Sequence, residues 1–158
     1  MCQLIVNIRS EQELRQFGEL LARSLPAATV VALRGTLGAG KTRLVQAVAA
    51  GLGVDPKVVT SPTFVLCQHY QGRLTIHHLD AYRLRDLDEF LELGADEYLD
   101  GPDITFIEWA DRVSACLPED YLDVMLEVVG PQARRLILNA HGPRNRETLD
   151  RLREAVER

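Results

Sequence analysis

In the first third of the chain, the spacing of apolar and polar residues predicts strands and helices in alternation. Residues 4–8 are apolar with one polar break and predict a short strand. The β-branched run TVVAL at 29–33 is typical of a strand buried on both faces. Ser10 and Glu13 form a capping-box pair before an apolar stripe with helical spacing. A second helical stripe over 44–52 ends at glycines, so the expected order is strand, helix, strand, helix.

The rest of the chain has mainly the pattern of strands. Two strands around a turn at 71–72 are predicted within 64–82, and a buried strand ending in a carboxylate within 103–109. The segments 121–130 and 134–142 are typical of a final antiparallel hairpin. We therefore expect a mixed α/β fold, with parallel strands early in the chain and antiparallel pairs in its middle and at its end.

Two further helices and one loop complete the predicted elements. Residues 86–99 form an amphipathic pattern broken by a glycine, and residues 145–158 predict a charged surface helix. Pro62 indicates a loop or a strand entrance within 58–64. Since no repeat or linker interrupts the pattern, we interpret residues 1–158 as a single domain.

Composition narrows the class of protein. Apolar residues make up 46% of the chain, as in globular proteins. The formal net charge of -5 argues against binding nucleic acid by electrostatic attraction alone, so RNA would be met through a partner or a local patch. The three cysteines lack CxxC spacing, and no signal peptide or long apolar run is seen. These features indicate a cytoplasmic protein with reduced thiols and no membrane segment.

The chemistry is concentrated in the segment GTLGAGKT at 35–42, which matches the phosphate-binding pattern G-x-x-x-x-G-K-[ST]. Its glycines allow main-chain N–H groups to surround phosphate oxygens, and the following helix directs its positive end there. Lys41, one of only two lysines, would neutralise the β- and γ-phosphates, and the Thr42 hydroxyl would bind Mg²⁺. A chance glycine-rich turn is the alternative. The buried strand before the segment and the amphipathic helix after it favour the phosphate-binding loop, or P-loop.

Two carboxylates at predicted strand ends complete the candidate site. Asp80 ends the strand LTIHHLD and Glu108 ends ITFIE. Ligands of open α/β sheets lie beyond the carboxyl ends of the strands, so both acids would reach the phosphate side. They are candidates for binding Mg²⁺ and for orienting water, and the sequence leaves open which does which. Capping a helix or pairing with an arginine is the alternative for each.

Two hydroxyl residues and one arginine are weaker candidates for a functional role. Ser61 and Thr63 flank a proline and would suit a loop that senses the γ-phosphate, or an ordinary turn. Arg83 would suit an arginine finger, although a surface salt bridge is the simpler interpretation.

Other polar and aromatic residues have two interpretations each. His77 and His78 suggest a metal, but adjacent residues of a strand point to opposite faces, which argues against a zinc site. Trp109 would pack near the site, face a partner or fill the core. Arg134 and Arg135 would touch nucleotide, partner or RNA, with a solvated hairpin as the default.

Several classes of P-loop protein fit the loop itself. No N-K-x-D stretch is present, so GTP specificity is not indicated. The segment after Asp80 lacks an evident lid of the kind that small-molecule kinases carry. A kinase of a small metabolite remains the alternative enzyme, and a nucleotide-dependent binding module with incidental hydrolysis is a second rival.

Four motifs taken together resemble one family. GTLGAGKT, SPTF, HHLDAYRL and FIEWADR, in this order and spacing, are similar to the TsaE (YjeE) family over about Ser10 to Pro118. The resemblance implies a three-layer P-loop fold with a mixed sheet that binds ATP or ADP with Mg²⁺ and hydrolyses ATP weakly alone. It also implies TsaB and TsaD as partners. TsaD transfers a threonylcarbamoyl group to a tRNA adenosine, and the ATP cycle resets that complex, so tRNA is met only indirectly.

The resemblance also implies roles for single residues. Thr42 and Glu108 would hold Mg²⁺, Asp80 would be needed for hydrolysis with Lys41 and Glu108, and Glu11 would lie on the nucleotide side. The residues that would hold the phosphates are Leu37, Gly38, Ala39, Gly40, Lys41 and Thr42. The chain departs from the family at Thr36, where an acidic residue is usual, and the missing negative charge would tighten nucleotide binding or alter a partner contact.

Overall fold

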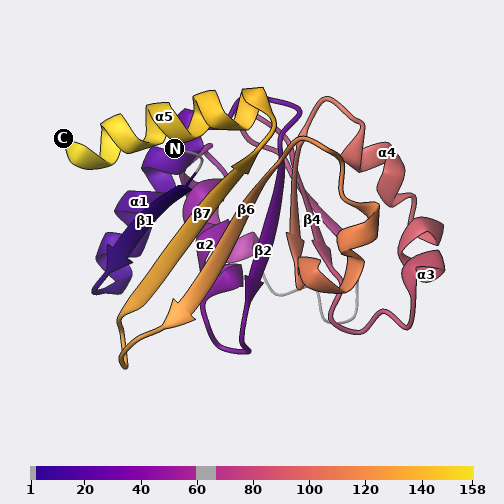
Figure 1. Cartoon of the computed structure of the whole chain (residues 1–158), viewed down its shortest axis with the longest axis horizontal. Helices are drawn as coiled ribbons and strands as arrows, with labels where there is room; N and C mark the ends of the chain where they lie inside the picture. The colour runs from indigo at the N-terminus through magenta and orange to yellow at the C-terminus, as the bar shows by residue number, and fades with distance from the viewer. Residues whose placement is uncertain (1–2, 60–66) are drawn as a thin grey trace.

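A seven-stranded sheet forms the centre of the protein in the computed structural model, which describes residues 3–59 and 67–158. Figure 1 shows the sheet with the ribbon coloured along the chain. In spatial order the strands are β1 (Gln3–Ile8), β7 (Arg134–His141), β6 (Tyr121–Val128), β2 (Val30–Gly35), β5 (Ile104–Glu108), β4 (Ile76–Asp80) and β3 (Cys67–Tyr70).

The pairing of the strands confirms the predicted mixed sheet. β2 pairs in parallel with both β5 and β6, and β4 pairs in parallel with β5. The pairs β3–β4, β6–β7 and β1–β7 are antiparallel. Both predicted hairpins are therefore present, and the strand that precedes the P-loop lies between two parallel neighbours.

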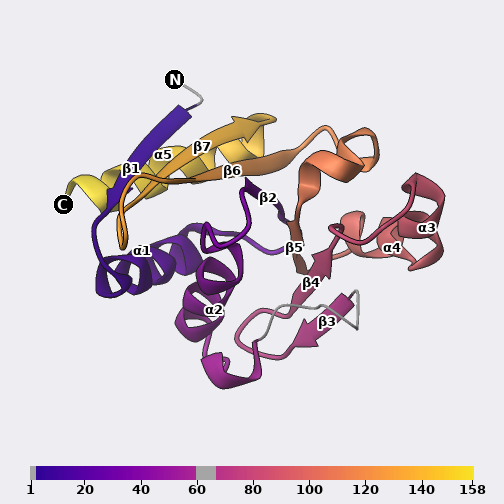
Figure 2. The same ribbon diagram turned by 90° about the horizontal axis from the view of Figure 1, so that it is seen from below.

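Helices cover the two faces of the sheet and give three layers, as Figure 2 shows. On one side α1 (Glu11–Ser24) and α2 (Lys41–Gly51) share a hydrophobic core with α5 (Pro143–Glu157) and the inward side chains of the sheet. The other side carries a smaller core beneath three short elements. These are α3 (Leu87–Glu92), α4 (Ala95–Leu99) and the 3₁₀ segment η2 (Ala110–Cys116).

The first helix begins where the capping box predicts. The Ser10 hydroxyl accepts a hydrogen bond from the Glu13 N–H at 3.2 Å, and the Glu13 carboxylate accepts one from the Arg9 N–H at 2.7 Å. α1 then packs directly on α2, because a Cβ atom added to Gly18 would lie 2.3 Å from the Cβ of Ala47. The missing side chain at Gly18 thus sets how closely the two helices approach.

Later helices differ in detail from the predicted ones. The pattern over 86–99 becomes two short helices, separated at Gly94 with a φ of 76°. The final helix begins at Pro143, earlier than predicted, and it buries Leu149 and Leu152 against the core rather than lying wholly at the surface. No helix in the described part of the chain is both long enough and apolar enough to cross a membrane.

Candidate functional site

The segment 35–42 joins the end of β2 to the start of α2, as the P-loop prediction requires. Gly40 precedes the helix with a φ of 106°, a left-handed conformation that glycine adopts without steric cost. Since glycine has no side chain, it offers no acceptor to the first N–H groups of α2. Unpaired N–H groups at the positive end of a helix are the kind of feature that can bind an anion.

Lys41 folds back over the loop from the first position of α2. Its Nζ donates hydrogen bonds to the carbonyl oxygens of Gly35 at 2.8 Å and Thr36 at 3.0 Å. The same atom lies 3.8 Å from the ring centroid of Trp109, a cation–π distance. Burial lowers the pKa of Lys41, while the nearby carboxylates of Glu108 and Asp80 act in the opposite direction.

The two predicted acids lie side by side at the carboxyl ends of β4 and β5. Asp80 and Glu108 are register partners in this parallel pair, and both are buried. The Thr42 hydroxyl donates to Glu108 Oε2 at 2.8 Å, which joins the P-loop helix to the end of β5. Among the described residues neither acid pairs with an arginine, so that alternative is not realised here.

Asp80 has a different environment from Glu108. One of its oxygens, Oδ1, accepts the backbone N–H of Tyr82 at 2.8 Å. Burial raises the pKa of Asp80, opposed by that hydrogen bond and reinforced by the nearby Glu108 charge. A carboxylate with a raised pKa accepts a proton more readily than an exposed one.

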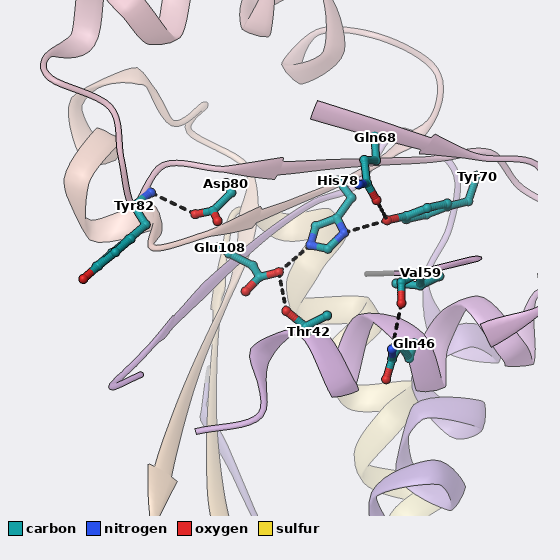
Figure 3. A network of polar contacts seen from close by, with 9 residues as sticks. All are labelled: Thr42, Gln46, Val59, Gln68, Tyr70, His78, Asp80, Tyr82 and Glu108. Atoms are coloured by element: carbon teal, nitrogen blue, oxygen red, sulfur yellow. Dashed lines mark hydrogen bonds and ion pairs between the residues drawn. The ribbon is translucent and has the colours of Figure 1, made fainter. Parts of the chain in front are cut away.

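Two of the histidines lie next to each other in the sequence and on opposite faces of β4, as predicted. His78 is fully buried, and its Nε2 lies 2.5 Å from Glu108 Oε2. His77 instead lies 2.9 Å, through its Nε2, from the carboxylate of Asp103. Figure 3 shows His78 between Glu108 on one side and Tyr70 on the other.

A cavity of about 550 Å³ opens at the P-loop. Its walls come from the P-loop, from the start of α1 and from the turn between β6 and β7. The site residues that line it are Glu11, Leu37, Gly38, Ala39, Gly40, Lys41, Thr42 and Glu108. Asp80 is adjacent to Glu108 but does not belong to the lining. The carboxylate of Glu11 pairs with Arg43 at the edge of this cavity.

Arg134 was expected to lie in a solvated hairpin, and this expectation is wrong. Its Nε donates to the carbonyl oxygen of Ala39 at 2.9 Å, and its other nitrogens reach the carbonyls of Gly38, Gly130 and Ala133. Arg135 does remain exposed and pairs with Glu127 on the neighbouring strand. The sequence holds no local signal for the Arg134 contact, because Ala39 is 95 residues away.

The remaining candidates lie at or outside the edge of the site. Trp109 lines the cavity, its ring lies 4.7 Å from that of Tyr82, and it also packs against the smaller core. The structure therefore bears out two of its interpretations, packing beside the cavity and core packing. Arg83 is exposed and forms no ion pair within the described ranges. The hydroxyl residues Ser61 and Thr63 fall outside the described residues.

Comparison with known proteins gives consistent matches. The profile of the family described as "Threonylcarbamoyl adenosine biosynthesis protein TsaE" matches residues 8–136. The tRNA threonylcarbamoyladenosine biosynthesis protein TsaE of Treponema pallidum is 41% identical over 128 residues, covering 81% of this chain and 94% of the relative. The protein of the same name from Bacillus subtilis is 34% identical over 145 residues, covering 91% and 90%. A crystal structure of Bacillus subtilis YdiB superposes with a TM-score of 0.82 at 29% identity, covering 98% of this chain and 96% of that one.

Proposed function

Because the chain belongs to the TsaE family of threonylcarbamoyl adenosine biosynthesis proteins, we propose that it is a P-loop ATPase whose hydrolysis supports a TsaB–TsaD pair. Its pathway is tRNA threonylcarbamoyladenosine biosynthesis, which the family serves. The finer parts of the proposal are ATP or ADP with Mg²⁺ as ligands, hydrolysis at the P-loop, and these two proteins as partners. The support for these parts comes from the site.

The hydrogen bond between Thr42 and Glu108 is the observation that carries the proposal. It brings the hydroxyl of the phosphate-binding pattern to 2.8 Å from a buried strand-end carboxylate, 66 residues away in the chain. Hydroxyl and carboxylate oxygens are the ligands that Mg²⁺ prefers, and P-loop NTPases use this pair of groups. An ordinary glycine-rich turn would not need such a partner.

The residues around the cavity fit a nucleotide with Mg²⁺. The N–H groups at the start of α2 lack a side-chain acceptor from Gly40, and Lys41 supplies a buried positive charge beside them. Thr42 and Glu108 would hold the metal ion. A Mg²⁺ ion held by these two residues would supply positive charge against the negative charge that develops on the phosphates.

Hydrolysis then depends on three side chains of this protein. Lys41 stabilises the negative charge on the transferred phosphoryl group, because its ammonium lies in a buried, weakly screened position. Asp80 orients the attacking water and accepts its proton, for which its raised pKa suits it. Glu108 is the metal ligand beside it.

The net charge of the protein supports the proposal that it meets tRNA only through its partners. A net charge of -5 repels the phosphate backbone of tRNA, so contact with the substrate would be made by the partners. The threonylcarbamoyl transfer itself belongs to TsaD in this scheme. The present chain supplies the ATP cycle that resets the complex between turnovers.

The test is steady-state ATP hydrolysis by the purified chain, alone and with a cognate TsaB–TsaD pair. Lys41→Ala is the inactive variant, and Lys57→Ala, at the only other lysine, is its matched control because Lys57 is exposed. We expect stimulation by the pair that is lost in Lys41→Ala and kept in Lys57→Ala. ATP hydrolysis that the pair leaves unchanged would contradict the proposal, and a search for phosphate acceptors would then test the metabolite-kinase alternative.

A further inference from the structure

We propose that His78 is a positioning residue that holds the Glu108 carboxylate in the orientation needed to bind a divalent cation. The inference rests on the proposed function, since it concerns the same Mg²⁺ ligand. His78 itself lies behind that ligand on β4 and is not part of the cavity lining.

The two carboxylate oxygens of Glu108 have different surroundings. Thr42 Oγ1 and His78 Nε2 both bond to Oε2, at 2.8 Å and 2.5 Å. Within the described part of the chain no hydrogen bond goes to Oε1, and Glu108 lines the cavity. An ionised carboxylate only accepts, so His78 donates from Nε2. The two donors on one oxygen fix the plane of the carboxylate and leave the other oxygen for a metal ion. Figure 3 shows that other oxygen pointing away from both donors.

His78 is itself held in place by a residue of the neighbouring strand β3. Its imidazole is fully buried, and its Nδ1 lies 3.0 Å from the Tyr70 hydroxyl. The Tyr70 hydroxyl also lies 2.5 Å from Gln68 Oε1, and its single hydrogen serves one of these two contacts at a time. Both of these residues are on β3, and Gln68 is the register partner of His78. The ring of His78 is therefore in polar contact at both nitrogens, with Glu108 at the end of β5 and with Tyr70 on β3, and it cannot rotate without losing both contacts.

Loss of the His78 donor should weaken the binding of the metal ion. A buried carboxylate with one donor fewer has more orientations of similar energy, and a metal ion must then select one of them. Groups that bond to metal ligands in this way typically change metal affinity or activity about 10- to 100-fold when they are removed. The effect falls on the metal ion and not on the phosphates, because the P-loop contacts of Lys41 do not involve His78.

The experiment separates the metal ion from the nucleotide. ADP affinity is measured by isothermal titration calorimetry in EDTA and then at a series of free Mg²⁺ concentrations, so that no hydrolysis is needed. The variants are His78→Leu, which removes the donor, and His78→Gln, which keeps an amide donor in the same place. His77→Gln is the matched control, because that neighbouring side chain faces Asp103 on the other side of the strand.

For His78→Leu we expect ADP affinity in EDTA close to that of the parent, and a Mg²⁺ midpoint raised about 10- to 100-fold. His78→Gln should recover part of this loss, and His77→Gln should match the parent. An unchanged Mg²⁺ midpoint in His78→Leu would overturn the inference, as would an equal loss of ADP affinity in EDTA. Failure of the parent itself to bind ADP would instead count against the proposed function.

A second variant keeps the test decisive where His78→Leu does not fold. Tyr70→Phe removes only the hydroxyl that holds His78 Nδ1 and leaves the ring in the core. Its Mg²⁺ midpoint should rise less than that of His78→Leu but in the same direction, with ADP affinity in EDTA retained. In that case a Mg²⁺ midpoint equal to that of the parent would overturn the inference.

Discussion

The guanidinium of Arg134 on β7 donates from Nε to the carbonyl oxygen of Ala39 in the P-loop, at 2.9 Å. The same side chain bonds to the carbonyls of Gly130 and Ala133 in the turn between β6 and β7. One residue therefore joins two of the segments that line the cavity, the turn between β6 and β7 and the loop at 35–42. The loop conformation depends on a strand from the far end of the chain.

Arg134→Ala should weaken ADP binding on the order of tenfold, since hydrogen bonds made by a charged group contribute about 1.5–3 kcal/mol. The loss arises because the P-loop carbonyls lose their donor and the loop must be ordered by the ligand instead. Calorimetric titration with ADP measures it. Arg135→Ala is the control, since the side chain of that arginine pairs with Glu127 and does not line the cavity, and equal losses in both variants would contradict the assignment.

Asp80→Asn should raise stability and lower hydrolysis at the same time. Burial raises the pKa of Asp80 above its ordinary value of 3.8, so the folded state binds more protons than the unfolded state between these two values. Stability contributed by this group therefore falls as pH rises through that window, and the ionised form is a cost at neutral pH. Removing the charge should raise the melting temperature at pH 7, and the gain should vanish below about pH 4.

The same variant should lose about 10²- to 10⁴-fold in ATP hydrolysis with the TsaB–TsaD pair, the usual contribution of a general base. Its ADP affinity should stay near that of the parent, because Asp80 does not line the cavity. Thermal unfolding between pH 3.5 and 8 and a coupled hydrolysis assay give the two readouts. A melting temperature that drops at pH 7 would show that the buried charge stabilises the fold, contrary to this expectation.

Gly18→Ala should destabilise the protein by about 1–3 kcal/mol, the typical cost of overpacking a core. The added Cβ would lie 2.3 Å from the Cβ of Ala47, so α1 and α2 must move apart. Urea unfolding measures the change. The double variant with Ala47→Gly should be less destabilised than the sum of the two single variants, because the shortest overlap is gone while those with the C and Cα atoms of residue 47, at 2.8 and 3.0 Å, remain. Additive losses would mean that the helices separate for another reason.

Thr36→Asp should weaken ADP binding several-fold, because it adds a negative charge beside the phosphates. Thr36 is exposed, and its carbonyl already accepts a hydrogen bond from Lys41 at 3.0 Å. Salt should reduce the difference between Thr36→Asp and the parent, since exposed charges are screened. Thr36→Asn has nearly the same shape without the charge and should bind like the parent. Equal affinities for the two variants would show that charge at this position does not matter.

The sequence predicts the elements well because their signals are local. The glycine spacing at 35–42, the Ser10 cap and the apolar runs of the strands each lie within a few residues. The structure confirms the strand–loop–helix order, the cap and the strands. The meeting of Asp80 with Glu108 also follows from a general rule about parallel strands.

Contacts between distant segments are what the sequence could not predict. That His78 faces Glu108, and not solvent, depends on the register of β4 against β5 and on Tyr70 from the edge strand. The reach of Arg134 to Ala39 likewise depends on the register that places the first residue of β7 between Ile8 and Val128. Neither the strand register nor the position of the Arg134 side chain can be deduced from residue type or spacing.

The order of the strands also sets how long their amide hydrogens survive in heavy water. β2 has parallel neighbours on both sides and is almost entirely buried, whereas β3 forms an edge of the sheet. Amides of β2 should therefore exchange last, through global unfolding, and those of β3 first, through local opening. The P-loop is thus attached to the strand that opens most slowly, and Tyr70 comes from one that opens early. Brief local unfolding of β3 would leave the Glu108 carboxylate free to change its orientation, while the loop at 35–42 keeps its conformation.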